Sequence, residues 1–151
     1  MKIIFILSII FLNVGCSKYS CPMKNAVVVD TEKYDVFNHV TLFSRDSIVG
    51  VVQPGEVSLL EYLDGFYSIE ITHFEGSKCE YRYLDTCWVN LGDSVGMETK
   101  LGVASINKIG DYYLGLIITN KKGRKVFNSR NFNCALHVKK KNVTKKLDKF
   151  K

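Results

Sequence analysis

Short runs of β-branched and aromatic residues, separated by turn signals, fill most of this chain and constrain its fold more than any other feature. Between residues 26 and 91 no window carries apolar residues at sustained helical spacing with caps, so the pattern predicts strands. Residues 97–108 fit either a short helix or a strand, and Gly102 disfavours the helix. The clearest turns are Asp64-Gly65, a strong hairpin dipeptide, and Asn120–Gly123. The expected strands are 26–29, 40–43, 48–52, 57–62, 66–71, 80–83, 87–91, 111–119, 124–128 and 133–138. The sequence therefore predicts an all-β fold.

The first 15 residues predict export. Lys2 precedes an apolar run over residues 3–12, which is shorter than the roughly 20 residues needed to span a bilayer and is typical of a signal peptide. The following Asn13-Val14-Gly15-Cys16-Ser17 resembles the lipobox of bacterial lipoproteins. That resemblance implies cleavage before Cys16, lipidation of its thiol with palmitate-type acyl chains, and sorting to the outer membrane facing the periplasm. Simple cleavage, giving a secreted or periplasmic soluble protein, is the alternative.

Cysteine usage agrees with an exported protein. Beyond Cys16 the chain has four cysteines, an even number that outside the cytosol indicates two disulfides. Three connectivities are open, and we favour Cys79–Cys87 with Cys21–Cys134. Closely spaced cysteine pairs of the kind that hold zinc are absent from the sequence, so no metal site is expected.

A resemblance to the bacterial SH3-like family covers residues ~38–95. It rests on the order of short strands, turn glycines and aromatics in Val40-Thr41-Leu42-Phe43-Ser44, Ile48-Val49-Gly50, Pro54-Gly55-Glu56-Val57, Gly65-Phe66-Tyr67-Ser68-Ile69 and Trp88-Val89-Asn90-Leu91. The resemblance implies a small five-stranded barrel. Because the connection from Ile71 to Thr86 is long, we expect an inserted hairpin there, fastened by Cys79–Cys87.

The chain is expected to divide into five parts: a signal peptide (1–15), a linker with the first strand (16–37), the SH3-like barrel (38–95), a C-terminal β extension packed on it (96–138) and a basic tail (139–151). A second, degenerate barrel is the alternative for residues 96–138. Formal net charge is +6, and the tail alone holds seven lysines against one acid. The body from 16 to 138 is therefore close to neutral. This distribution argues against a nucleic-acid partner, which requires basic charge on the folded surface.

Candidate binding residues come from the aromatic-rich segment around the expected insertion. Tyr81, Arg82 and Tyr83 are predicted to form an exposed patch, and Trp88 is a further ligand-binding candidate, with burial of Trp88 in the barrel core as the alternative. The three histidines lack a nucleophile or carboxylate at a catalytic spacing, and no phosphate-binding loop occurs. No catalytic residue and no cofactor is expected.

These features favour a non-enzymatic cell-envelope lipoprotein, anchored to the membrane, that binds a cell-wall (peptidoglycan) peptide or an envelope protein. The alternative is a periplasmic immunity or inhibitor protein that neutralises a toxin or hydrolase, for which a rigid disulfide-tied β-domain is suited. A small hydrolase with an unfamiliar site is a third hypothesis. The oligomeric state does not follow from the sequence.

Overall fold

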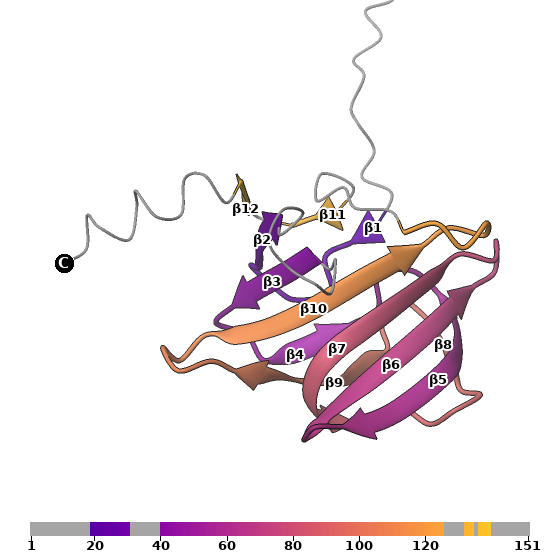
Figure 1. Ribbon diagram of the computed structural model, residues 1–151, viewed down its shortest axis with the longest axis horizontal. Helices are drawn as coiled ribbons and strands as arrows, with labels where there is room; N and C mark the ends of the chain where they lie inside the picture. Colours follow the sequence, from indigo (N-terminus) through magenta and orange to yellow (C-terminus); the bar gives the residue numbers. More distant parts are fainter. Residues whose placement is uncertain (1–18, 31–39, 126–131, 135, 140–151) are drawn as a thin grey trace, which may run out of the picture.

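The computed structural model describes residues 19–30, 40–125, 132–134 and 136–139 (Figure 1). The expected signal peptide, Cys16 and nearly all of the basic tail lie outside the described residues. The described part contains twelve strands and no helix, which confirms a small all-β fold. The strands are β1 (Tyr19–Ser20), β2 (Val27–Asp30), β3 (Val40–Ser44), β4 (Ile48–Gly50), β5 (Gly55–Leu63), β6 (Phe66–His73), β7 (Lys78–Cys87), β8 (Ser94–Val95), β9 (Lys100–Ile106), β10 (Tyr112–Thr119), β11 (Phe132–Asn133) and β12 (Leu136–Lys139).

Ten of the strands form one sheet in the order β12-β2-β3-β10-β9-β7-β6-β5-β8, with β4 attached to β9. Strand β7 is the branch point, because it pairs with β10 along Lys78–Arg82 and with β9 from Leu84 to Cys87. β10 in turn pairs with β3, so β3, β10, β7, β6 and β5 run side by side (Figure 1). β1 and β11 form a separate parallel pair.

The expected SH3-like barrel is not confirmed, and an open sheet stands in its place. β12 and β8 are the two ends of the sheet order, and no pairing within the described part of the chain joins them. β9 and β10 come from the segment 96–138, which we expected to extend a barrel, and they occupy the centre of the sheet. The strands of residues 38–95 therefore do not close on one another as a five-stranded barrel requires, because β9 and β10 pair between them.

The segment Trp88–Leu91, expected to be the last strand of the barrel, forms no strand. The chain turns at Asn90 instead, because its amide donates to the Asp93 carboxylate over 2.7 Å and its carbonyl accepts from the Asp93 amide over 3.1 Å. The expected inserted hairpin is the long β6–β7 hairpin, which is part of the main sheet.

One of the two expected disulfides is present. Cys21 and Cys134 are bonded across 113 residues of sequence, and closing a loop of that length contributes about 5 kcal/mol in the loop-entropy model. The bond ties the segment before β2 to the segment after β11. Ser20 attaches the same N-terminal segment to the chain after β4, since its hydroxyl donates to the carbonyl of Val51 over 2.9 Å.

The other expected disulfide, Cys79–Cys87, is wrong. Both cysteines are free and lie on the single strand β7. Eight residues of extended chain span roughly 26 Å, whereas a disulfide needs Cα atoms within about 7 Å. The prediction placed these cysteines on two strands of a short hairpin, but the strand runs without a break from one to the other.

The core lies on the inner face of the sheet and is filled mainly by aliphatic side chains, together with Tyr19, Tyr81 and Phe132. Tyr81 is fully buried, and its hydroxyl accepts a hydrogen bond from the Val52 amide over 2.8 Å. Gly102 allows β9 to approach β7, because a Cβ at this position would collide with the Thr86 carbonyl oxygen. The remaining fully buried side chains include Met23, Leu42, Ile69, Ile71, Leu84, Leu101, Leu114 and Leu116.

Candidate binding surface

Strand β7 contains a bulge that reverses the direction of one tyrosine. Opposite β6, Tyr81 pairs with Ile69 and Leu84 pairs with Tyr67, so Arg82 and Tyr83 together oppose the single residue Ser68. Tyr83 has a φ of 66°, a left-handed conformation that is a true outlier for a bulky side chain. In a regular strand residues 81 and 83 would share a face. The bulge instead leaves Tyr81 in the core and turns Tyr83 to the outer face.

On the outer face Tyr83 contacts rings from two other strands. Its ring centre lies 5.8 Å from that of Phe66 in an edge-to-face arrangement and 5.5 Å from that of Tyr113. Both distances lie in the range of favourable aromatic pairs. Since Phe66 comes from β6 and Tyr113 from β10, the bulge joins aromatic side chains of three neighbouring strands into one cluster.

Two further side chains extend this cluster across the sheet. Phe43 on β3 is the cross-strand partner of Tyr113, and Leu63 on β5 is that of Phe66, so each shares the face of its partner. Leu63 is 69% exposed. We call this set the aromatic row: Phe43, Tyr113, Tyr83, Phe66 and Leu63, in the strand order β3-β10-β7-β6-β5 (Figure 1).

Polar groups next to the aromatic row are paired with one another. Arg82 contacts Glu80 through two bonds of 2.5 and 3.2 Å, and Ser105 donates to Asp85 over 2.6 Å. Burial raises the pKa of the Tyr113 hydroxyl above its usual range, and the nearby Tyr83 and Asp85 groups add to the shift. Tyr113 is therefore a neutral hydroxyl at physiological pH. The surface therefore offers apolar rings, two of which carry a hydroxyl group that can form hydrogen bonds.

The structure separates the four predicted binding residues. Tyr81 is wrong as a surface residue, because the alternation of β7 places it in the core. Tyr83 lies in the aromatic row, and the Arg82 side chain beside it is 28% exposed and bound to Glu80. Trp88 is 51% exposed, which excludes the core alternative, but it follows the end of β7 and contacts no other described aromatic ring. Only Arg82 and Tyr83 are brought together.

Sequence reasoning missed Phe43, Leu63, Phe66 and Tyr113 as surface residues. The Asp64-Gly65 turn carried enough information to place Leu63 opposite Phe66 on one face. The contact between Tyr83 and Tyr113 depends on the pairing of β7 with β10, which links segments more than 30 residues apart and has no local signal.

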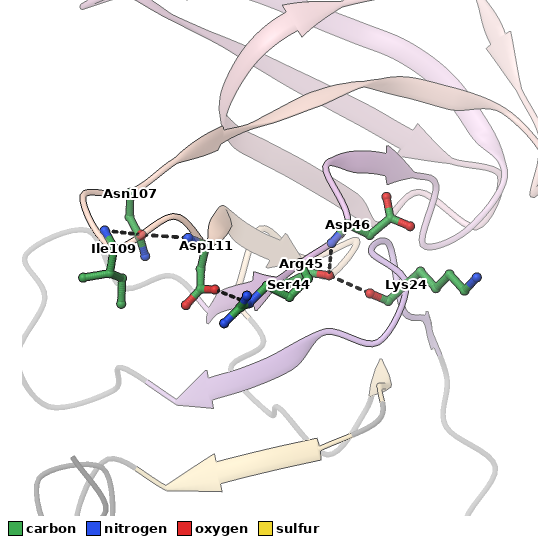
Figure 2. Close-up of polar contacts among 7 residues, drawn as sticks. All are labelled: Lys24, Ser44, Arg45, Asp46, Asn107, Ile109 and Asp111. Carbon is green, nitrogen blue, oxygen red and sulfur yellow. Dashed lines mark hydrogen bonds and ion pairs between the residues drawn. The ribbon is translucent and has the colours of Figure 1, made fainter. Parts of the chain in front are cut away.

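A polar hollow of about 510 Å³ lies at the junction of the segment before β2, the β3–β4 turn and β10. Figure 2 shows its polar contacts: the Ser44 hydroxyl donates to the Lys24 carbonyl over 2.6 Å and accepts from the Asp46 amide over 2.9 Å. Arg45 pairs with Asp111 over 2.8 Å. Because these polar groups already form hydrogen bonds and an ion pair with one another, their role in this hollow is to hold the loops together.

The described residues give no sign of a metal centre or a membrane-spanning helix. Within residues 19–30, 40–125, 132–134 and 136–139, no three His, Cys, Asp or Glu side chains gather closely enough to hold a metal ion. His73, the one histidine whose side chain is described, is buried with its Nδ1 3.1 Å from the Pro54 carbonyl oxygen, a structural position. The same part of the chain contains no helix long and apolar enough to cross a bilayer.

No protein-family model and no curated protein matches the chain. Solved structures of the same fold do exist. A chain of the SpoIIQ–SpoIIIAH pore-forming complex superposes with a TM-score of 0.56 at 15% identity, covering 74% of this chain and 88% of that one. A chain of a second SpoIIIAH–SpoIIQ complex gives a TM-score of 0.54 at 19% identity, over 68% of this chain and 76% of that one.

A third similar structure is a protein from Ruminococcus gnavus assigned as a glycyl-glycine endopeptidase, LytM. It superposes with a TM-score of 0.62 at 20% identity, covering 82% of this chain and 64% of its own length. At these identities the likenesses establish a shared β-sheet fold. They place the chain beside sporulation-complex and LytM-like structures, and SH3-like domains are not among these neighbours.

Proposed function

We propose that this chain is a non-enzymatic cell-envelope protein that recognises another protein through the aromatic row. The single observation that carries the proposal is the outward-turned Tyr83, held between Phe66 and Tyr113 by a left-handed bulge. A left-handed tyrosine costs about 1–3 kcal/mol, and such backbone strain gathers at sites where it is part of the function. Here the strain places an aromatic ring on a surface.

The composition of the aromatic row suits protein recognition. Tyrosine and phenylalanine bring large apolar area at a low entropic cost, and the energy of protein interfaces is concentrated in a few such anchors. The rings lie on adjacent strands of a sheet, so they are held rigidly before binding. The adjacent ion pair of Arg82 and Glu80 supplies a polar border, as at the rim of an interface.

The similar structures support an envelope setting and a protein partner. Two of them are chains of a SpoIIQ–SpoIIIAH complex, and the third is assigned as a glycyl-glycine endopeptidase. The proposal adds export by the N-terminal apolar run, lipidation at Cys16, anchoring in the outer membrane, and the absence of catalysis. A cell-wall peptide is the competing occupant of the aromatic row, because an extended peptide also packs on half-buried surface rings.

The test compares a double variant, Phe66→Ala with Tyr83→Ala, with the control Phe74→Ala. Phe74 is 84% exposed in the β6–β7 turn, away from the aromatic row, so its removal controls for lost surface hydrophobicity. Cross-linking in the native host identifies partners, and binding is then measured with the purified pair. We expect the double variant to bind at least about 10-fold more weakly and Phe74→Ala to bind normally. Equal binding by the double variant would refute the proposal.

Two further measurements separate the competing functions. Sedimentation with purified peptidoglycan, lost in the same double variant, would favour the cell-wall peptide. Co-purification of a toxin or hydrolase in a one-to-one complex, with loss of that enzyme's activity, would favour the immunity or inhibitor alternative.

A further inference from the structure

Strand β5 has a free edge over most of its length. On the side away from β6, β8 pairs with only Gly55 and Glu56, and Val57 exchanges backbone bonds of 2.9 Å with Gly92 and Asp93. From Leu59 to Leu63 no described residue pairs with this side of the strand. A strand edge of this kind presents unpaired backbone donors and acceptors to any chain that can extend along it.

The hairpin geometry identifies the backbone groups on the free edge. Asp64 and Gly65 have φ values of 55° and 87°, which make a two-residue type I′ turn. Such a turn is closed by a hydrogen-bonded pair, here Leu63 with Phe66. Along an antiparallel ladder hydrogen-bonded pairs alternate with non-hydrogen-bonded pairs, so Leu60 and Tyr62 belong to non-hydrogen-bonded pairs. The amides and carbonyls of Leu60 and Tyr62 therefore point away from β6, toward the open side.

The side chains along this edge are unusually apolar for an unprotected strand. Tyr62 is 64% exposed and Leu63 is 69% exposed, next to the half-buried Leu59 and Leu60. Natural edge strands are blunted by charged side chains, above all lysine, by proline, by a bulge, by a covering segment or by short length. β5 has a bulge between Val57 and Leu59, and the free edge beyond it carries one charge, that of Glu61. β5 is nine residues long and contains neither lysine nor proline. The edge thus has the features of a surface that accepts a further strand.

Charge indicates what that strand contains. Glu56, Glu61 and Asp64 have no ion-pair partner in the described part of the chain, and β5, its turn and β8 carry no basic residue. A second copy of this chain, paired edge to edge, would bring two sets of these acids together. An extended segment of another protein in which basic residues alternate with apolar ones would be attracted instead.

We propose that the free edge of β5, Leu59–Leu63, adds an extended, basic and apolar segment of a partner protein as an additional strand of the sheet. Backbone hydrogen bonds to Leu60 and Tyr62 supply the pairing, and the acidic side chains select the basic segment. Leu63 belongs to both surfaces, but the strand pairing uses the backbone of Leu60 and Tyr62, whereas the aromatic row offers side chains on the outer face. The proposal therefore does not depend on the function proposed above.

The test uses a labelled ten-residue peptide in which lysine alternates with valine, and a second peptide with glutamate in place of lysine. Binding is measured by fluorescence anisotropy at low and high salt. Tyr62→Pro is compared with Tyr62→Ala, because both lose the ring but only proline loses the outward amide. We expect the basic peptide to bind Tyr62→Pro about 10-fold more weakly than Tyr62→Ala, and the acidic peptide not to bind.

Hydrogen exchange of the wild-type chain tests the same proposal if Tyr62→Pro fails to fold. The basic peptide should slow exchange at the amides of Leu60 and Tyr62, and Phe66→Ala with Tyr83→Ala should leave this protection in place. Three results would overturn the proposal: no binding of the basic peptide, equal binding to the proline and alanine variants, or concentration-dependent dimers that block the edge.

Discussion

Tyr81 and Tyr83 are the same residue type, two positions apart on one strand, and they have opposite environments. Tyr81 is fully buried and its hydroxyl accepts a hydrogen bond from the Val52 amide, whereas Tyr83 packs on the outer face between Phe66 and Tyr113. The difference comes from one bulge and one left-handed residue, not from composition. A single irregular backbone position is therefore enough to turn a side chain from the core to the outer face.

Replacement of Tyr81 gives the largest expected effect. Tyr81→Ala removes a buried ring and should cost about 3–5 kcal/mol of unfolding free energy. Tyr81→Phe keeps the ring but leaves the Val52 amide without its acceptor, and should cost about 1–3 kcal/mol. Tyr83→Ala should cost about 1 kcal/mol or less, since its ring lies on the surface. Urea unfolding of the three variants measures this, and equal losses for Tyr81→Ala and Tyr83→Ala would contradict the assignment of faces.

The two free cysteines of β7 extend the comparison to reactivity. Cys79 is fully buried, and burial raises the pKa of its thiol well above its usual range, whereas Cys87 is half-buried at the end of the strand. We expect iodoacetamide to modify Cys79 at least about 100-fold more slowly than Cys87, because Cys79 reacts only when the sheet opens.

Mass spectrometry after timed labelling measures both rates, and urea serves as the control that should make them similar. Similar rates without urea would show that β7 is not part of a stable core. The same spectra report whether Cys21 and Cys134 remain unlabelled, as their disulfide requires.

The parts of the fold that the sequence predicted correctly are those with local causes. Asp64-Gly65 forms its turn because both positions tolerate positive φ. The apolar run 111–119 forms β10 because Leu114, Leu116 and Ile118 alternate along it and fill the core, with Tyr112 packed beside them. The SH3-like barrel was not confirmed because closure depends on which distant strands pair, and β10 pairs with β3 and β7 across the sheet.

The candidate binding surface was less predictable than the strands. The expectation that residues 81–83 form one exposed patch fails at Tyr81, which is in the core, whereas Arg82 and Tyr83 are half-buried on the outer face. No sequence rule locates a bulge at a tyrosine, because the usual residue in this conformation is glycine. The expected Cys79–Cys87 bond failed for a related reason, because the strand between them continues through the bulge without turning back.

A pair of substitutions at position 83 tests the bulge itself. Tyr83→Ala and Tyr83→Gly both remove the ring, but glycine adopts a φ of 66° without strain. We expect Tyr83→Gly to be more stable than Tyr83→Ala by about 0.5–1 kcal/mol, after the greater entropy of the glycine variant's unfolded chain is included. The matched control is Glu61 on β5, where Gly should be less stable than Ala. If glycine is less stable than alanine at both positions, the backbone at Tyr83 is not strained.

Titration of Tyr113 gives the smallest expected effect and tests the contact across the aromatic row. Burial, then the charges of Tyr83 and Asp85, raise the Tyr113 pKa, so the folded state disfavours the phenolate. The unfolded chain releases this proton first as pH rises, and stability therefore falls above pH of about 10, where free tyrosine ionises. Tyr83→Phe should move the Tyr113 pKa back toward its ordinary value, and Tyr81→Phe should not. Carbon NMR of Cζ-labelled tyrosine resolves the two cases. If the Tyr113 pKa is the same in Tyr83→Phe as in the wild type, the two rings are not in contact. The aromatic row would then be two separate groups, one on each side of the β7–β10 boundary.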